Sequence, residues 1–445
     1  MKEHPSLDRL QQWLDSYLNF ERLPQKDIFW LDTMEFLCQK LGNPQDTFPS
    51  VHVAGSKGKG STSVMIASIL EAAGYKSGLY TSPHILDFSE RIGTASGVLP
   101  EQVYEAATRE LMQGVDSIIP QDLPGQRPIT WFELVTTFAF LCFREAQVDW
   151  AVFETGLGGR LDATNVVNPK ISVITPIELE HTEFLGATIR KIAGEKAGII
   201  KQNRPVVLGI QKRAALEVLE ARAKELHAPV ISVADLVKAS GKMNGNHMDI
   251  KLESKQFSRP ITTKLSLLGD YQIWNAATAA LTVKSLRPSI KEETIEEGLQ
   301  RARLGGRFEV LQWEDVEIVL EGAHTPNSIE LSLKTFDDYK KNTQSTGKKS
   351  HLLFACAADK DVNTIANLFT GFNYVILTRP GGDKQSNTVL LQQAFKAAGH
   401  NFTYYQDFNE AIEKSLLESQ KDGAILLVTG SFYLVAEVKK WIKSH

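Results

Sequence analysis

A glycine-rich turn between a short apolar run and a helical pattern is the feature that most constrains the fold. The sequence V-H-V-A-G-S-K-G-K-G-S-T-S occupies residues 51–63. Residues 51–54 predict a buried strand, and apolar residues recur at helical spacing from Val64 almost to Gly74. A strand–turn–helix unit of this kind aims backbone N–H groups and the positive end of a helix at one point. The turn therefore suits a phosphate group.

Two side chains in the turn have the chemistry of a nucleotide site. Lys59 can reach the terminal phosphates of a nucleotide, and the Ser61 hydroxyl can ligate Mg²⁺. Gly60 separates them, so the spacing differs from the usual Walker A motif. The alternative is a plain glycine turn with a solvated lysine. The strand before the turn and the helix after it favour nucleotide binding.

Strand-like and helix-like segments alternate along most of the chain. This order predicts an α/β fold with mostly parallel sheets flanked by helices. Helical patterns are clear at residues 130–144, 214–226 and 273–286, whereas 247–253 and 261–267 alternate polar and apolar residues and predict a small antiparallel insertion. The predicted strands are 51–54, 77–81, 150–154, 171–175, 206–209, 308–313, 318–320, 351–355, 374–378, 402–405 and 425–429.

The length of 445 residues predicts at least two domains. We interpret the charged stretch at 289–309, which contains Gly305 and Gly306, as a hinge. An N-terminal P-loop ATPase domain is then expected at residues 1–303, and a smaller Rossmann-like α/β domain at 304–445.

Composition excludes several classes of protein. A net charge of −4 does not suggest a protein that coats nucleic acid or a membrane surface. The three cysteines lie far apart and form no CxxC, so we expect reduced thiols and neither a disulfide framework nor a zinc site. Residues 1–20 are charged throughout, without a signal-peptide core, and the apolar run near 135–143 is too short to span a membrane. We expect a cytoplasmic protein with no nucleic-acid or membrane partner.

Polar clusters follow three other predicted strands, at residues 81–84, 154–162 and 178–182. In an open parallel sheet, ligands bind outside the carboxyl ends of the strands, so these clusters should converge with the glycine-rich turn. Their carboxylates, hydroxyls and imidazole beside a phosphate would suit Mg²⁺ or Mn²⁺. Taken alone, His181 fits an ordinary loop histidine and Glu154 a strand-end cap. Their joint placement favours a metal site.

Lys196 falls on an apolar helical face. At 100° per residue it shares that face with Ile189, Ile192 and Ala193. A buried lysine is costly unless it is paired or neutralised. The residues alone favour a side chain that snorkels to solvent at the helix end.

Together these motifs resemble the folylpolyglutamate synthase/dihydrofolate synthase family of the Mur ligase superfamily. The resemblance extends over nearly the whole chain, and GLGGRLDATN together with TSPH…ERI is quite specific. The matching segments are GSKGKGS (55–61), TSPHILDFSERI (81–92), ETGLGGRLDATN (154–165), EHTEFLG (180–186), IAGEKAGIIK (192–201), DYQIWNAATA (270–279), GGRFEV (305–310), LEGAHTPNS (320–328), ADKD (358–361) and TGSFYLV (429–435).

The resemblance implies an ATP- and Mg²⁺-dependent ligase that adds L-glutamate to reduced folates and to 7,8-dihydropteroate through an acyl phosphate. Family members that only polyglutamylate make a monofunctional enzyme the main alternative. Two Mg²⁺ ions and a carbamylated Lys196 are also implied, and we expect a monomer. Other Mur-type ligases, a catalytically silent ATP-binding module and a P-loop kinase are the remaining rivals.

The resemblance also implies roles for individual residues. The implied catalytic residues are Lys59, Lys196, His181 and His324; the ATP-binding residues are Gly55, Gly58, Lys59, Gly60, Ser61, Asn275, Arg307 and Glu321; the metal ligands are Ser61, Ser82, Glu154 and His181; and the pterin-pocket residues are Thr130, Trp131, Phe132, Glu133, Leu161, Asp162 and Ala163.

Several residues depart from the family pattern. Glu180 and Glu321 stand where aspartates are usual, and Lys57 stands where asparagine is frequent. Thr155 replaces a common valine, Gly305 a frequent proline and Thr325 an asparagine common in bacterial members. None of these removes an expected metal or phosphate ligand, so activity is expected, while the fine substrate preference stays open.

Overall fold

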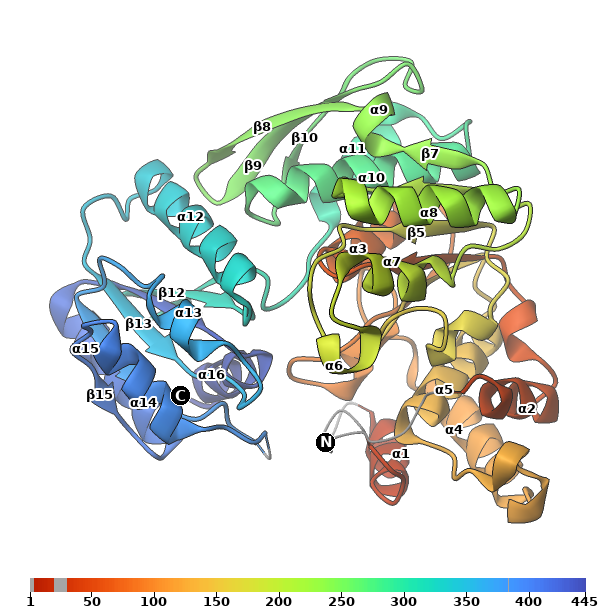
Figure 1. Cartoon of the computed structure of the whole chain (residues 1–445), viewed down its shortest axis with the longest axis horizontal. Helices are drawn as coiled ribbons and strands as arrows, with labels where there is room; N and C mark the ends of the chain where they lie inside the picture. The colour runs from red at the N-terminus through yellow and green to blue at the C-terminus, as the bar shows by residue number, and fades with distance from the viewer. Residues whose placement is uncertain (1–3, 20–29, 383) are drawn as a thin grey trace. The chain divides into compact units, whose positions relative to one another are not determined.

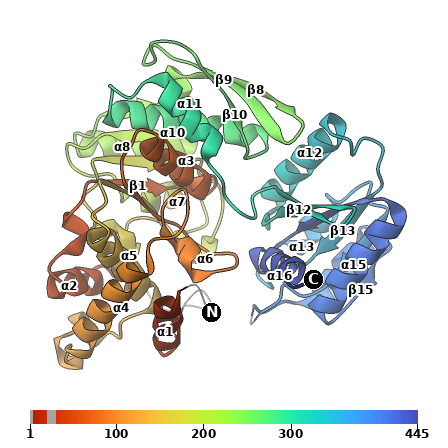
Figure 2. The same cartoon turned by 180° about the vertical axis from the view of Figure 1, so that it is seen from behind.

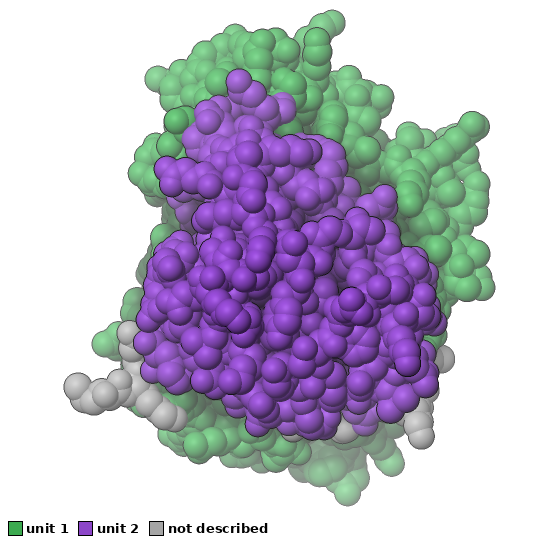
Figure 3. Space-filling model, turned by 90° about the vertical axis from the view of Figure 1, so that its left-hand side faces the viewer, with its two compact units in different colours: residues 1–240, 250–264, 271–302 green, residues 241–249, 265–270, 303–445 purple. Residues whose placement is uncertain are grey.

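The computed structural model describes residues 4–19, 30–382 and 384–445, so residues 1–3 and 20 of the charged N-terminal segment lie outside it. The chain forms two compact units (Figure 3). One contains residues 1–240, 250–264 and 271–302, and the other contains 241–249, 265–270 and 303–445. Among the described residues, no helix has the length and apolar character needed to cross a membrane.

A seven-stranded sheet forms the centre of the first unit. Its strand order is β3-β2-β4-β1-β5-β6-β7, and every neighbouring pair is parallel except β2 with β3. The order places β2, β4, β1 and β5 side by side, so their carboxyl ends meet at one edge. The strands are β1 (Ser50–Ala54), β2 (Ser77–Tyr80), β3 (Ile92–Gly93), β4 (Trp150–Glu154), β5 (Ile171–Ile174), β6 (Val206–Leu208) and β7 (Val230–Ser232).

Helices of the first unit bury the apolar strands. One core joins the sheet to α1, α2, α4 and α5, and another joins it to α7 and α8. All five residues of β1 and of β4 are buried, as expected for a central parallel strand covered on both faces. The helices are α1 (Pro5–Leu14), α2 (Asp32–Lys40), α3 (Lys59–Ala72), α4 (Glu101–Asp116), α5 (Trp131–Glu145), α6 (Thr182–Leu185), α7 (Ile189–Ala197), α8 (Arg213–Glu225), α9 (Val233–Leu236), α10 (Asp270–Leu286) and α11 (Glu292–Arg301).

The predicted insertion is a three-stranded sheet in the order β10-β9-β8 (Figure 1). Its strands are β8 (Lys238–Asn244), β9 (His247–Glu253) and β10 (Ile261–Leu265). Only residues 245–246 connect β8 to β9, which forces an antiparallel pair. The prediction of a small antiparallel insertion is confirmed.

The middle of the charged stretch interpreted as a hinge is helix α11, so that interpretation is wrong for residues 292–301. The helix packs on α3, where Ser68 Oγ donates a hydrogen bond to the Gly298 carbonyl at 2.7 Å. A Cβ at Gly298 would lie 2.4 Å from the Ile69 Cα, so only glycine permits this close approach.

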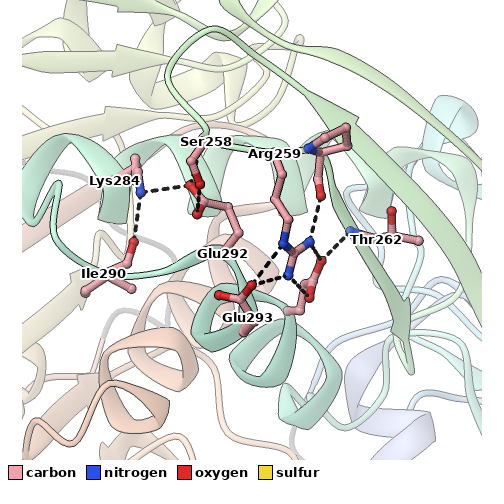
Figure 4. Close-up of polar contacts among 9 residues, drawn as sticks. Ser258, Arg259, Thr262, Lys284, Ile290, Glu292 and Glu293 are labelled. Carbon is pink, nitrogen blue, oxygen red and sulfur yellow. Dashed lines mark hydrogen bonds and ion pairs between the residues drawn. The ribbon is translucent and has the colours of Figure 1, made fainter.

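The charges of α11 hold the loop between β9 and β10 (Figure 4). Arg259 Nη1 donates to Glu296 Oε1 at 2.7 Å, and its Nε donates to Glu293 at 3.0 Å. Lys284 Nζ lies 2.8 Å from Glu292 Oε1 in a pair that is largely buried. The charges that suggested a hinge therefore form structural ion pairs.

The second unit is built on a six-stranded sheet. Its order is β11-β12-β16-β13-β14-β15, and only β11 with β12 is antiparallel. The predicted α/β fold class is confirmed. The elements are β11 (Glu309–Trp313), β12 (Val316–Glu321), α12 (Pro326–Asn342), β13 (Ser350–Phe354), α13 (Val362–Ala366), β14 (Tyr374–Leu377), α14 (Thr388–Ala397), β15 (Thr403–Tyr404), α15 (Phe408–Asp422), β16 (Ile425–Thr429) and α16 (Phe432–Ser444).

Candidate active site

The glycine-rich turn connects β1 directly to α3 (Figure 2). Gly55 has φ 152° and Gly58 has φ 82°, backbone conformations that favour glycine. Both glycines also lack room for a side chain. A Cβ at Gly55 would lie 1.8 Å from Thr175 Oγ1, and one at Gly58 would lie 2.4 Å from Asn275 Oδ1. The turn and Asn275, both predicted to bind ATP, are therefore in close contact.

Hydrogen bonds hold the turn against the loop after β5. The Ser56 and Lys57 amides donate to the Pro176 carbonyl at 2.9 Å and 3.1 Å. Lys59 Nζ donates to the Gly55 carbonyl at 3.2 Å, so its ammonium lies at the turn. Gly60 and Ser61 are buried in the first turn of α3, where backbone N–H groups lack helical acceptors.

Lys196 points inward, and the snorkelling interpretation is wrong. Its side chain is 1% exposed and donates to the Gly55 carbonyl at 2.7 Å and to Glu180 Oε1 at 3.1 Å. Burial lowers the pKa of Lys196 to about 8, although the charge of Glu180 opposes the shift. Burial alone would raise the pKa of Glu180, but nearby cations, Lys196 first and then Lys59, lower it to about 2.

The predicted metal ligands are only partly brought together. Glu154 ends β4 and is 4% exposed, and the Ser82 amide, after β2, donates to its Oε2 at 3.3 Å. Ser61 follows β1, the neighbour of β4. His181 lies exposed after β5, with φ 46°. In the described part of the chain, no group of three or more His, Cys, Asp or Glu side chains could hold a metal ion.

Two of the predicted pterin residues cap α5. Thr130 Oγ1 accepts from the Glu133 amide, while Glu133 Oε2 accepts from the Thr130 amide at 2.7 Å. This capping box satisfies backbone donors that would otherwise be free. Burial raises the pKa of Glu133. Both side chains thus have a local structural role whatever else they contact.

Trp131 and Phe132, at the start of α5, contact the segment that contains Arg91 and the loop after β4. Trp131 is 6% exposed, and the Arg91 guanidinium carbon lies 4.9 Å from the centre of its ring. Phe132 packs on the loop after β4, where a Cβ at Gly156 would lie 2.5 Å from Phe132 Cζ. The start of α5 and the residues around 156 therefore lie side by side, as a shared pocket would require.

Asp162 organises the loop after β4. It accepts hydrogen bonds from the Leu157 amide at 2.8 Å and from the Thr164 amide at 3.1 Å. Burial raises its pKa, and these donors oppose the shift. Leu161 beside it is half-buried and Ala163 is buried.

The second unit brings its own predicted residues together. The Arg307 guanidinium carbon lies 3.9 Å from the centre of the Phe432 ring, and the His324 ring meets the same phenyl edge-on. Glu321, at the end of β12, accepts from the Phe308 and Ala323 amides at 2.9 Å each. Glu321 and His324 thus lie at the carboxyl end of β12, and Arg307 comes from the segment that precedes the antiparallel strand β11.

The predicted set omits Glu180 and Arg91, which the structure places against predicted residues. Glu180 contacts Lys196 directly, and its position beside His181 in a polar loop was the available signal. Arg91 is 1% exposed, and its Nε donates to His84 Nδ1 at 2.6 Å. Both residues lie in motifs of the family resemblance, but their spacing in the sequence does not indicate which residues they contact.

Sequence families match most of the chain. The Mur ligase middle domain matches residues 53–283, and the Mur ligase glutamate ligase domain matches residues 306–432. The dihydrofolate synthase/folylpolyglutamate synthase of Bacillus subtilis is 33% identical over 97% of this chain and 98% of its own length. The chain belongs to the dihydrofolate synthase/folylpolyglutamate synthase family. The family resemblance predicted from the motifs is confirmed.

Solved members of the family have the same fold. Mycobacterium tuberculosis folylpolyglutamate synthase, complexed with ADP and AMPPCP, superposes with a TM-score of 0.86, at 26% identity and 98% coverage of both chains. Escherichia coli FolC, in complex with DHPP and ADP, gives a TM-score of 0.83 at 27% identity, covering 98% of each chain. This family consists of ATP-dependent ligases.

Proposed function

We propose that this chain is an ATP-dependent ligase that adds L-glutamate both to tetrahydrofolates and to 7,8-dihydropteroate. One observation carries the proposal. Four neighbouring parallel strands, β2, β4, β1 and β5, end in Ser82, Glu154, the glycine-rich turn and the Glu180–His181 loop. A phosphate-binding turn, a buried carboxylate and a buried lysine therefore share one edge of the sheet, where open α/β sheets bind ligands.

The reaction follows from the need to bring two anions together. A carboxylate oxygen of the acceptor attacks the γ-phosphorus of ATP, which releases ADP and leaves an acyl phosphate. The neutral amine of L-glutamate attacks the acyl carbon, and the tetrahedral adduct expels phosphate and loses a proton to give the amide. Lys59 and the N–H groups at the start of α3 would stabilise the phosphoryl charge as the carboxylate approaches.

The residues at this edge fit Mg²⁺ in part. Ser61, Ser82 and Glu154 offer oxygen ligands, which Mg²⁺ prefers. Few protein ligands are usual for Mg²⁺ where phosphate groups of the substrate complete its coordination. The exposed imidazole of His181 fits less well. We propose that these four residues hold two ions, whose chemical contribution when bound is to neutralise phosphate charge.

We further propose that Lys196 is carbamylated. Only the neutral amine reacts with CO₂, and a pKa of about 8 leaves roughly a tenth of Lys196 neutral at pH 7. That is about 300-fold more neutral amine than a pKa of 10.5 would allow. Because a carbamate beside Glu180 would place two anions together, we expect bound cation to accompany the modification.

Roles for the remaining predicted residues complete the proposal. We assign Arg307, Glu321 and Asn275 to the nucleotide and His324 to the glutamate end. The packing of Arg307 and His324 on Phe432, and the two amides that fix Glu321, support pre-positioned side chains. Thr130–Glu133 and Leu161–Ala163 would line the pterin pocket. We propose domains at 1–303 and 304–445, and a cytoplasmic monomer without nucleic-acid or membrane partners.

The test is incubation of the purified chain with ATP, Mg²⁺ and L-glutamate and either dihydropteroate or tetrahydrofolate, followed by mass spectrometry. We expect both acceptors to gain glutamyl residues and to release ADP. A gain with tetrahydrofolate alone would indicate the monofunctional alternative. ADP release without glutamate would favour a kinase, and inactivity with both acceptors would leave another Mur-type ligase or a silent ATP-binding module.

A further inference from the structure

A chain of buried side chains connects β1 to the loop after β4. His52, in the middle of β1, is fully buried, and its Nε2 lies 2.8 Å from Thr164 Oγ1. Thr164 Oγ1 lies 2.5 Å from Asp162 Oδ1. Thr164 is also fully buried and Asp162 is 5% exposed. These hydrogen-bonded side chains therefore extend from the strand that leads into the glycine-rich turn to the loop proposed to line the pterin pocket.

The direction of these hydrogen bonds follows from their donors. Thr164 Oγ1 donates to Asp162 Oδ1, and although burial raises the pKa of Asp162, the amides of Thr164 and Leu157 that it also accepts from favour the ionised carboxylate. An ionised Asp162 accepts the hydroxyl proton of Thr164, so Thr164 Oγ1 must accept from His52. His52 therefore carries its proton on Nε2. Its Nδ1 is buried and has no hydrogen-bond partner among the described residues.

Burial supports a permanently neutral histidine. Burial first, and then the charge of Lys201, lower the pKa of His52 well below its ordinary value. A neutral imidazole with one proton is a fixed donor, in contrast with a hydroxyl, which rotates to suit its neighbours. His52 thus determines which way the Thr164 hydroxyl points.

We propose that His52 is a positioning residue for the acceptor site: through Thr164 it fixes Asp162, and Asp162 fixes the loop at residues 155–165. Its own side chain contacts no substrate. This inference rests on the proposed function, because the loop is proposed there to line the pterin pocket. We call the hydrogen bonds from His52 through Thr164 to Asp162 the relay. Loss of the relay should therefore raise the KM for the pterin acceptor more than the KM for ATP.

Paired substitutions separate the hydrogen bonds from packing. Thr164→Val removes the hydroxyl with little change of volume, and Thr164→Ser retains it. His52→Leu removes the donor, and His52→Gln places an amide N–H near the position of Nε2. We expect Thr164→Val and His52→Leu to raise the KM for dihydropteroate about tenfold or more, since small misplacements at a site are costly. Thr164→Ser and His52→Gln should restore it, with the KM for ATP within about twofold throughout.

His351 is a matched control in the second unit. It is also a buried histidine, 1% exposed, whose ring nitrogens lie 3.0 Å from Ser419 Oγ and 3.3 Å from Asp422 Oδ2. His351→Leu should lower the melting temperature without changing the KM for dihydropteroate. The inference is overturned if His351→Leu raises that KM equally, or if Thr164→Val leaves it unchanged.

Two measurements do not depend on catalysis, so failure of the proposed function and failure of this inference are distinguishable. Nitrogen NMR of His52 should show a neutral ring at pH 7 with its proton on Nε2. Hydrogen exchange of the Leu157 amide should be faster in Thr164→Val than in Thr164→Ser. A proton on Nδ1, or equal exchange in the two variants, refutes the relay even if the wild-type chain is an active ligase.

Discussion

Replacing Glu180 by glutamine removes the charge that faces Lys196 at 3.1 Å with little change in side-chain size. With a Lys196 pKa of about 8, the protonated form of Lys196 in the folded chain is more stable than the neutral form by about 1.4 kcal/mol at pH 7, because each pKa unit is 1.36 kcal/mol. If glutamine lowers that pKa to 7 or below, this contribution disappears. We expect a loss in the free energy of unfolding between this 1.4 kcal/mol and the roughly 3.4 kcal/mol that corresponds to the fall of the Glu180 pKa from 4.5 to about 2. A stranded buried charge would cost about 3–5 kcal/mol, but Lys196 can release its proton.

The pH dependence of this loss has a definite sign. The pKa of Glu180 is about 2, so its carboxylate stays ionised at every assay pH. The ion pair therefore exists below pH 8 and is lost as pH rises through the pKa of Lys196. Because that pKa is lower in the folded chain than its ordinary value of 10.5, the folded chain releases this proton first. The stability of the wild type then rises with pH between about 8 and 10.5 from this group.

Urea denaturation of wild type and Glu180→Gln at pH 7 and pH 9 measures both effects. The destabilisation should be present at pH 7 and nearly absent at pH 9. Glu217→Gln, an exposed glutamate paired with Arg190 and Arg213, is the control and should change little at either pH. No loss at pH 7, or a loss that is independent of pH, would refute the reasoning.

Three further substitutions test the turn and the fold. Lys59→Met should reduce kcat by roughly 10²–10³-fold with an unchanged circular dichroism spectrum, as when a preorganised charge-stabilising donor is removed. Gly58→Ala should raise the KM for ATP about tenfold, because φ is 82° and its Cβ would meet the Asn275 side chain, whereas Gly74→Ala, at φ 85° with open space, should leave that KM unchanged. Glu292→Gln should lower stability by about 1–3 kcal/mol in thermal denaturation, since Lys284, whose side chain is 13% exposed, loses its counterion.

Regular elements were predictable where local pattern and burial agree. The predicted bounds of the strands 150–154 and 425–429 agree with the structure at both ends. Parallel strands that are buried on both faces consist of nearly continuous apolar residues, which are easy to recognise in a sequence. The stretch at 289–309 is misleading because its charges and its glycine pair are also typical of a hinge. Those of α11 pair with Arg259 and Lys284, which lie elsewhere in the sequence.

The sequence identifies the motifs of the candidate site, but it does not show which of their residues contact one another. The turn at 55–61 is recognisable from its own residues, because glycine chemistry is local. The residues alone place Lys196 in solvent, since its partners, Glu180 and the Gly55 carbonyl, become neighbours only through the sheet order. The hydrogen bonds from His52 to Asp162 are likewise invisible in the sequence, because they join strand β1 to the loop after β4, and His52 and Thr164 are 112 positions apart in the chain.

The most direct test of the central claim follows an oxygen atom. Dihydropteroate with a heavy-oxygen-labelled carboxylate is incubated with the purified chain, ATP, Mg²⁺ and L-glutamate, and the released phosphate is analysed by mass spectrometry. Ligation through an acyl phosphate predicts one labelled oxygen in each phosphate that accompanies dihydrofolate. Dihydrofolate formed with unlabelled phosphate, or ATP consumed without any dihydrofolate, would contradict it.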